Sequence, residues 1–152
     1  MKINIQRIPP EGEALRGAEP GSILDFVDEN VKFESEIQYD FFAQIQGRAL
    51  LVTGKLQTPA TLRCGRCLKT FKRPIVVDQF VVHQELAGED FVDLTDSIRE
   101  DILLQLPQRA LCQENCRGLC VRCGADLNES ACQCKAESGD LRWHALDQIK
   151  LK

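Results

Sequence analysis

Eight cysteines, arranged as four close pairs, constrain the fold of this 152-residue chain more than any other feature. Six of them fall between residues 112 and 139, where large apolar side chains are few, so this stretch cannot build an ordinary hydrophobic core. A C-x2-C turn suits zinc because both thiolates reach one ion at about 2.3 Å, and two pairs complete a tetrahedron. The sequence therefore predicts one or two four-cysteine zinc sites. In chain order the pairs are Cys64 and Cys67, Cys112 and Cys116, Cys120 and Cys123, and Cys132 and Cys134.

The pairing of these cysteines into sites follows from the cost of closing loops. Eight residues separate the third pair from the fourth, so these two pairs can close a local site with little loss of entropy. The first pair would then meet the second. In the alternative, the two C-x2-C turns (the first and third pairs) share one ion as a zinc ribbon, and the second and fourth pairs form the other site. Gly124 directly follows the second C-x2-C and permits the tight turn of a zinc knuckle.

Cellular location and charge limit the possible functions. The chain has no run of about 18 apolar residues that could span a bilayer, and its N-terminal MKINIQRIPP lacks the apolar stretch of a secretory signal. We therefore expect a cytoplasmic protein, in which clustered thiols bind metal more often than they form disulfides. The net charge of -4 argues against a uniformly basic nucleic-acid binder.

The pattern of apolar residues between 31 and 86 predicts an antiparallel β-sheet. VKFESEIQYDFF, RALLVTGKL, ATLRC and FKRPIVVDQFVVHQEL alternate or are rich in β-forming residues, and their connections are too short for crossover helices. Residues 57 to 59 separate the second strand candidate from the third. The opening segment, through PPEGEALRGAEPGS, has no periodic pattern and is predicted to be a loop or a flexible arm.

A helical period follows the sheet. TDSIREDILLQLP places its apolar residues at helical spacing, with Thr95 or Ser97 as the cap and Pro107 as the end. The tail GDLRWHALDQIKLK predicts a second, short helix. The fold class is thus α+β: an antiparallel sheet with a main packed helix and a cysteine-rich zinc-binding C-terminal segment. We assign the sheet, the helix and the first C-x2-C to residues 1–110, and the cysteine-rich segment with its terminal helix to residues 111–152, and we expect the two parts to form one compact unit.

Basic residues surround the first cysteine pair without an intervening acid. In one interpretation they form a solvated hairpin edge that discourages strand pairing. In the other, cations around a rigid knuckle grip RNA phosphates while an aromatic ring stacks on a base. The candidate RNA-binding residues are Arg63, Arg66, Lys69, Phe71, Lys72 and Arg73.

Catalytic motifs are missing from the sequence, so we expect no enzyme. His83 and His144 lack the partner spacing of metal ligands or catalytic bases, and cysteines committed to zinc leave no open coordination position. One alternative is a thiol redox protein or sensor that uses Cys64 and Cys67, although strand-like sequence flanks CGRC where a βα unit is expected. Another is an iron-sulfur radical enzyme, because CRGLCVRC has C-x3-C-x2-C spacing, but the chain is short for the barrel such enzymes need.

Several segments in one order resemble a known family. TLRCGRCLKTF, LPQRALC, CQENCRGLCVRCGADLN, a C-x-C and DLRWHAL together resemble the YceD family, the large ribosomal RNA subunit accumulation proteins, from about residue 45 to the C-terminus. The resemblance implies a role in accumulation or processing of large-subunit ribosomal RNA and a link to large-subunit ribosomal proteins. It also places the family's metal motif on the eight cysteines, with zinc as a scaffold. We therefore expect a non-enzymatic zinc-binding factor that acts through RNA or an assembly partner, without a membrane or a small-molecule substrate.

Overall fold

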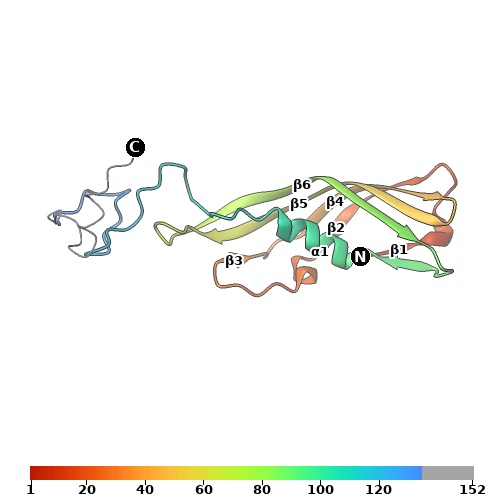
Figure 1. The fold of residues 1–152 in the computed structure, drawn as a ribbon, viewed down its shortest axis with the longest axis horizontal. Coiled ribbons are helices and arrows are strands. Elements are labelled where there is room, and N and C mark those ends of the chain that lie inside the picture. The colour runs from red at the N-terminus through yellow and green to blue at the C-terminus, as the bar shows by residue number, and fades with distance from the viewer. Residues whose placement is uncertain (135–152) are drawn as a thin grey trace, which may run out of the picture.

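The computed structural model describes residues 1–134, and its dominant element is one antiparallel β-sheet (Figure 1). Strand β5 lies at the centre of this sheet, and β6 pairs along one of its sides. On the other side β5 pairs with β4, which in turn pairs with β2, and β3 pairs with β5 beyond the end of β4. A separate two-stranded sheet joins β1 and β7. The strands are β1 (Lys2–Asn4), β2 (Glu13–Glu19), β3 (Val31–Lys32), β4 (Ile37–Gln46), β5 (Ala49–Arg63), β6 (Thr70–Glu85) and β7 (Phe91–Asp93); the helices are η1 (Ile5–Arg7), η2 (Gly21–Leu24) and α1 (Thr95–Leu104).

The predicted antiparallel sheet and main helix are confirmed, but the balance between them differs from the expected α+β fold. Helix α1 is the one α-helix within residues 1–134, and the sheet dominates that part of the chain. The predicted tail helix lies outside the described residues. Over the described range, no helix is both long enough and apolar enough to cross a membrane.

Strand β5 runs unbroken for 15 residues where the sequence predicts two strands. The predicted break is wrong because a proline at position 59 costs the sheet no ladder hydrogen bond. On one side of β5, pairing with β4 ends at Gln57 and pairing with β3 begins at Thr61, so Pro59 lies in the gap between them. On the other side Pro59 faces Pro74 of the edge strand β6, where neither residue needs an N–H.

The N-terminal segment is not the loop or flexible arm that its composition predicts. Strand β2 pairs with β4 over its whole length, from Glu13 opposite Ala43 to Glu19 opposite Ile37. It lies at the edge of the sheet with most of its residues exposed or half-buried, so backbone hydrogen bonds hold it without an alternating apolar pattern. The predicted strand VKFESEIQYDFF is likewise split, into β3 and β4.

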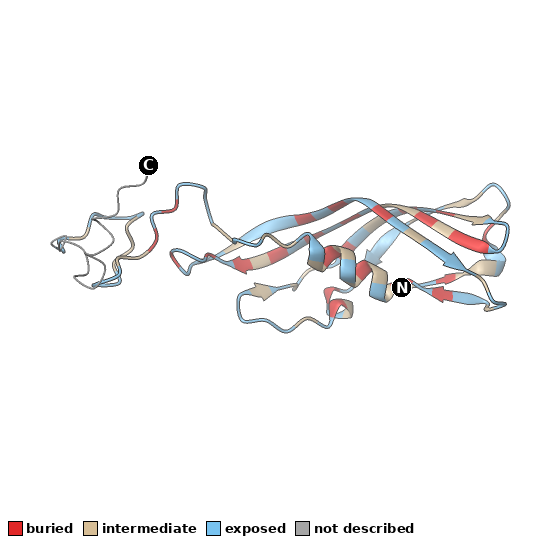
Figure 2. Ribbon diagram, viewed as in Figure 1, coloured by how far each residue is buried: buried red, intermediate tan, exposed pale blue. Residues whose placement is uncertain are grey.

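Buried side chains gather on one face of the sheet, the face that α1 covers (Figures 1 and 2). Phe41 of β4 stacks on Phe80 of β6, with ring centroids 4.6 Å apart, and α1 adds Ile98 and Ile102. A β-bulge places one extra residue in β6 between Phe80, opposite Gly54, and Val77, opposite Leu56. The extra residue lets both Val77 and Phe80 face the core, although they are three residues apart. The core therefore extends along the whole hairpin.

Two connections place the cysteine-rich segment. At the start of α1, the carboxylate of Asp93 accepts a hydrogen bond from the backbone N–H of Thr95 at 3.0 Å, so Asp93 provides the acceptor that the sequence assigns to Thr95 or Ser97. After α1 the chain runs beside the β5–β6 hairpin to its tip (Figure 1). There the N–H of Gly65 donates to the carbonyl of Ala110 at 2.8 Å, which ties the tip to the segment that follows the helix.

Candidate metal centres

Four cysteines from the first and second pairs meet at the tip of the β5–β6 hairpin, in a group that we call the first centre. Their Sγ atoms all lie within 4.8 Å of one another; Cys64 and Cys116 are 3.8 Å apart, and Cys67 and Cys112 are 3.7 Å apart. A tetrahedron with Zn–S bonds of about 2.3 Å has S···S edges of about 3.8 Å, so this spacing suits a four-thiolate ion. Three of the four cysteines are buried, and Cys112 is exposed.

The third and fourth pairs form the second centre. The Sγ atoms of Cys120, Cys123, Cys132 and Cys134 also lie within 4.8 Å of one another. This is the pairing that loop closure favours, and the zinc-ribbon alternative is not the one that the structure shows. The C-x3-C-x2-C stretch is consequently not one motif, because Cys116 belongs to the first centre and the next two cysteines belong to the second.

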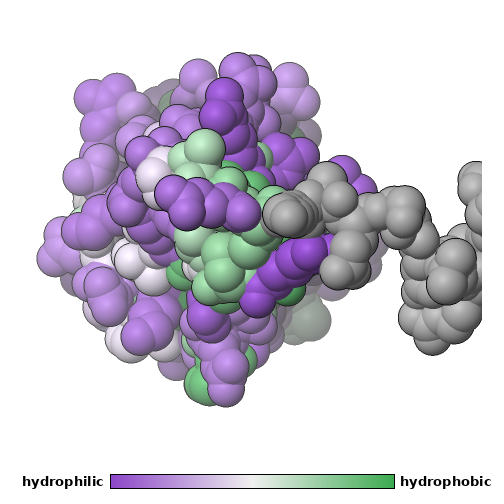
Figure 3. All heavy atoms as spheres, turned by 90° about the vertical axis from the view of Figure 1, so that its left-hand side faces the viewer, coloured by the Kyte–Doolittle hydropathy of each residue, from purple (hydrophilic) through white to green (hydrophobic). Residues whose placement is uncertain are grey.

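The second centre lies nearer to solvent than the first. Cys123 is exposed, whereas Cys64 of the first centre is fully buried. Viewed from the cysteine-rich end, hydrophobic residues gather in a central patch, with hydrophilic residues beside it (Figure 3). Val121, within the C-x2-C turn of the second centre, is 100% exposed. We therefore expect reagents and chelators to reach the second centre first.

The two C-x2-C turns share one backbone geometry, and we call them the first knuckle (Cys64–Leu68) and the second knuckle (Cys120–Gly124). In each, the N–H of the first cysteine donates to the carbonyl five residues later, at 2.9 and 2.8 Å, and the N–H four residues later donates back to that cysteine, at 2.9 Å in both. The residue after the second cysteine is left-handed in both, with φ of 61° at Leu68 and 72° at Gly124. The equivalence was hidden in the sequence because only the second knuckle has the glycine that this conformation favours.

The knuckles lower the pKa of the first thiol in each centre. Burial raises the pKa of Cys64, but the backbone N–H groups that face its sulfur outweigh burial and lower it to about 6. Backbone N–H groups of the second knuckle, led by that of Cys123, lower the pKa of Cys120 to about 6. Opposite them, burial and the neighbouring thiols raise the pKa of Cys112 to about 12, and the hydrogen bond with Cys123 followed by burial raises that of Cys134 to about 12. The lowered pKa values favour the thiolate form of Cys64 and of Cys120 at neutral pH.

Polar groups outside the first centre orient Cys116. The guanidinium Nη1 of Arg66 donates to the carbonyl of Cys116 at 2.8 Å, and the side-chain amide of Asn128 donates to its sulfur at 3.5 Å. Asn128 is itself held by Asp126, whose Oδ1 accepts from its amide at 2.7 Å, and its own oxygen accepts from the N–H of Arg117 at 2.8 Å. Such contacts fix the geometry of metal ligands and tune their basicity.

A salt bridge ties the first knuckle to the residues that follow the second. The ammonium of Lys69 lies 2.7 Å from Oδ2 of Asp126 and also contacts the carboxylate of Glu129. The hydrogen bond from Lys69 lowers the pKa of Asp126 to about 2, and both carboxylates raise the pKa of Lys69. Sequence reasoning missed Asp126, Asn128 and Glu129 as supporting residues, although the local acidic and amide run ADLNES next to a knuckle was a signal.

The predicted RNA-binding residues do not form one surface. Arg66 and Lys69 are engaged by the contacts around the metal centres described above. Phe71 is half-buried and packs against both the sheet core and the first centre, so its ring is not free to stack on a base. By register, Arg63 and Lys72 lie on the face of the hairpin away from the core, whereas Arg73 lies on the core-side face. Arg63, Lys72 and Arg73 are exposed.

Comparison with known proteins finds similarity to one family over part of the chain. The family model described as "Large ribosomal RNA subunit accumulation protein YceD" matches residues 78–150. The predicted family resemblance is confirmed. The YceD match begins within β6 and not near residue 45, so it contains three of the cysteine pairs and leaves the pair at Cys64 and Cys67 outside.

Individual relatives extend the comparison. The chloroplastic "Large ribosomal RNA subunit accumulation protein YCED homolog 1" is 32% identical in Arabidopsis thaliana, over 39% of this chain and 18% of the relative, and 44% identical in Zea mays, over 32% and 17%. The chain therefore spans less than a fifth of the length of these plant relatives. An uncharacterized protein of Mycobacterium tuberculosis is 26% identical over 98% of this chain and 81% of its own length. No solved structure matches the chain.

Proposed function

We propose that this chain is a non-enzymatic, zinc-stabilised factor that supports the accumulation of large-subunit ribosomal RNA by binding that RNA. The observation that carries the proposal is the YceD match over residues 78–150, a range that includes six of the eight cysteines. The two plant relatives have names that refer to the same RNA.

Zinc is the metal that the donor set favours. Each centre offers four cysteine sulfurs within 4.8 Å of one another, and a set of four sulfur ligands favours zinc over hard cations such as magnesium or calcium. Four protein ligands close the coordination sphere, so a bound ion has no position left for water or substrate. In this proposal zinc holds the cysteine-rich segment together and attaches it to the hairpin, and it takes no part in a reaction.

The thiol redox alternative is less well supported by the site. A pKa of about 6 would make Cys64 a thiolate at neutral pH, which favours a nucleophile. However, Cys64 is fully buried and Cys67 is 4% exposed, so a disulfide substrate cannot reach either sulfur. Cys112 and Cys116 also complete a four-thiol group around them, which is a metal-binding arrangement.

A salt-titrated binding assay tests the RNA-binding proposal. The zinc-loaded chain is titrated with fragments of large-subunit ribosomal RNA. The same assay is run on one variant in which Arg63, Lys72 and Arg73, the predicted cations outside the contacts that hold the metal centres, are all replaced by glutamine. Direct binding predicts weaker affinity and a shallower dependence on salt in this variant. Unchanged affinity in the variant would exclude RNA binding through these residues. Recovery of ribosomal proteins in a nuclease-treated pull-down would instead favour an assembly partner.

A further inference from the structure

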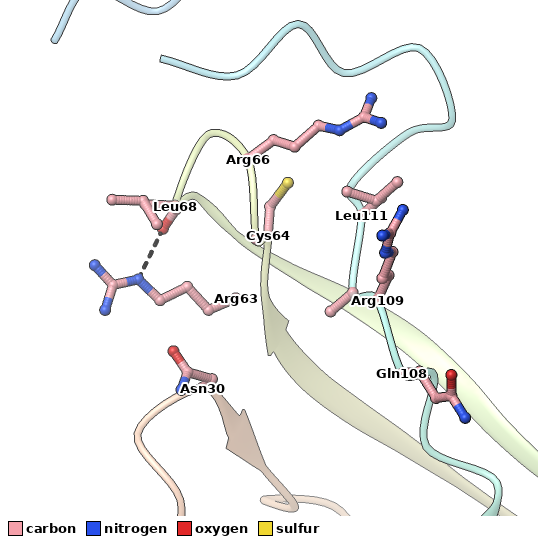
Figure 4. A pocket seen from close by; sticks show the side chains of 10 residues that line it. Asn30, Arg63, Cys64, Arg66, Leu68, Gln108, Arg109 and Leu111 are labelled. Carbon is pink, nitrogen blue, oxygen red and sulfur yellow. Dashed lines mark hydrogen bonds between the residues drawn. The ribbon is translucent and has the colours of Figure 1, made fainter. Parts of the chain in front are cut away.

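A hollow of about 590 Å³ lies beside the first knuckle. Three segments that are distant in sequence line it (Figure 4): Asn30 before β3, the end of β5 with the first knuckle, and residues 108–111 after α1. Its volume falls within the range of about 300–1,000 Å³ that is typical of ligand sites. The hollow therefore depends on the tertiary structure and on the docking of the segment after the helix.

The lining of this hollow is cationic. It contains three arginines, Arg63, Arg66 and Arg109, and two side-chain amides, Asn30 and Gln108, and it includes no aspartate or glutamate. Arg63 donates from Nε to the carbonyl of Leu68 at 3.3 Å, which orients its guanidinium (Figure 4). Within residues 1–134, neither Arg63 nor Arg109 forms an ion pair with a carboxylate. Their charge is thus available to an anionic ligand.

The negative charge of a zinc ion bound by four thiolates in the first centre does not cancel the positive charge of the hollow. Zinc with four thiolates carries a net charge of about -2, whereas the three arginines supply about +3. Of the three arginines, Arg66 offsets the negative charge of the first centre most directly, because its guanidinium donates to the carbonyl of Cys116. Arg63 and Arg109 are exposed and lie outside that arrangement.

We propose that this hollow binds a phosphodiester and the adjoining base of single-stranded RNA. Arginine forks match phosphate oxygens in a bidentate manner, so Arg63 and Arg109 grip the backbone. The amides of Asn30 and Gln108 can read the edge of an unpaired base, and Leu68 and Leu111 offer apolar surface for its face. This inference rests on the proposed function and specifies its RNA contact, which keeps Arg63 and Arg66 of the sequence-predicted set and adds Arg109. Lys69, Phe71, Lys72 and Arg73 lie outside the lining of the hollow.

The test uses the full zinc-loaded chain and fluorescein-labelled single-stranded oligoribonucleotides from large-subunit ribosomal RNA. The pocket variant carries Arg63→Gln and Arg109→Gln. The matched control carries Lys72→Gln and Arg73→Gln, which remove the same amount of charge from β6, outside the hollow. We expect the pocket variant to bind the RNA about tenfold or more weakly and the control to bind less than about threefold more weakly. In the pocket variant, the slope of log affinity against log salt concentration should become shallower by about 0.7 for each phosphate contact removed.

Each other result has a definite meaning. Equal losses in both variants would overturn the pocket and leave RNA binding as a diffuse charge effect, so the proposed function would survive. Absence of RNA binding by the unmodified chain would overturn the RNA function itself. Equally tight binding of poly-glutamate in the hollow would overturn RNA as its occupant. If the pocket variant loses zinc, its affinity no longer tests the hollow, and photo-crosslinking of the unmodified chain to 4-thiouridine RNA takes its place. We expect the crosslinked peptides to contain residues 63–68 and 108–111, and crosslinks confined to other residues would overturn the proposal.

Discussion

The ammonium of Lys69, directly after the first knuckle, lies 2.7 Å from Oδ2 of Asp126, which follows the second knuckle. This ion pair connects a residue of the sheet hairpin to the loop of the second centre. Asp126 also holds Asn128, which donates to the sulfur of Cys116 in the first centre. The two centres are therefore linked through side chains as well as through the chain itself.

Replacing Asp126 by asparagine is expected to loosen the second centre from the hairpin. The variant keeps the shape of the side chain but removes the charge that pairs with Lys69, so we expect a lower melting temperature and faster zinc loss to a chelator. Asp78→Asn is the matched control, because the Asp78–Lys55 pair is exposed on both sides, at 71% and 68%, and such pairs contribute little. Equal effects of the two variants would contradict a special role for the Lys69–Asp126 contact.

Serine at Cys116 and serine at Cys120 are expected to remove different zinc ions. The structure assigns Cys116 to the first centre and Cys120 to the second, so each variant should retain about one zinc. Element counting gives the number of ions, and protection of the remaining cysteines from alkylation identifies the centre that stays loaded. If both substitutions leave the same four cysteines unprotected, the division into two centres is wrong.

Alkylation of the metal-stripped chain should depend on pH in an ordered way. Because the pKa of Cys120 is lowered to about 6, its thiolate and its reaction with iodoacetamide increase as the pH rises through that value. Cys134, with a pKa of about 12, stays protonated and slow up to strongly alkaline pH. Because the pKa of Cys120 is lower in the folded chain than in the unfolded chain, its thiolate stabilises the metal-free fold. This stabilisation is fully present above the ordinary thiol pKa and is lost as the pH falls through about 6. Equal rates for Cys120 and Cys134 at pH 7, measured by peptide mass spectrometry, would disagree with the site geometry.

Glycine in place of Leu68 is expected to stabilise the first knuckle slightly. A left-handed leucine costs about 1–2 kcal/mol, whereas the added freedom of glycine in the unfolded chain costs about 0.5–1 kcal/mol, so the net gain is about 0.5–1 kcal/mol. Leu68 is 47% exposed, and its loss removes little buried surface. Gly124→Ala provides the reverse control: its new Cβ meets no atom within 4 Å, so only the backbone conformation is penalised. Chemical denaturation of the zinc-loaded proteins measures both effects, and stabilisation by the control would refute the argument.

Valine in place of Thr58 is expected to stabilise the sheet. Thr58 is fully buried, and its hydroxyl has no hydrogen-bond partner within residues 1–134. Since burying an unpaired hydroxyl costs about 1–3 kcal/mol, its replacement by a methyl group should raise the free energy of unfolding by about 1 kcal/mol or more. Thr53→Val, on the opposite face of β5 and only half-buried, should have a smaller effect. A loss of stability in Thr58→Val, measured by denaturant titration, would indicate an unseen partner for the hydroxyl.

The sequence by itself determined the features that depend on short spacings. Alternation predicted the hairpin of β5 and β6, helical spacing predicted α1, and the short loop between the third and fourth cysteine pairs predicted the local second centre. Tertiary structure alone decided the features that depend on distant partners. Backbone pairing with β4 turned the predicted flexible arm into β2, and the gap between β3 and β4 let Pro59 stay within one strand. Register placed Arg63 and Lys72 on the same face of the hairpin, and the path after α1 brought Arg109 into the lining of the same hollow as Arg63. Periodicity and loop entropy are local properties that a sequence displays, whereas edge-strand hydrogen bonds and contacts between remote segments exist only once the chain has folded.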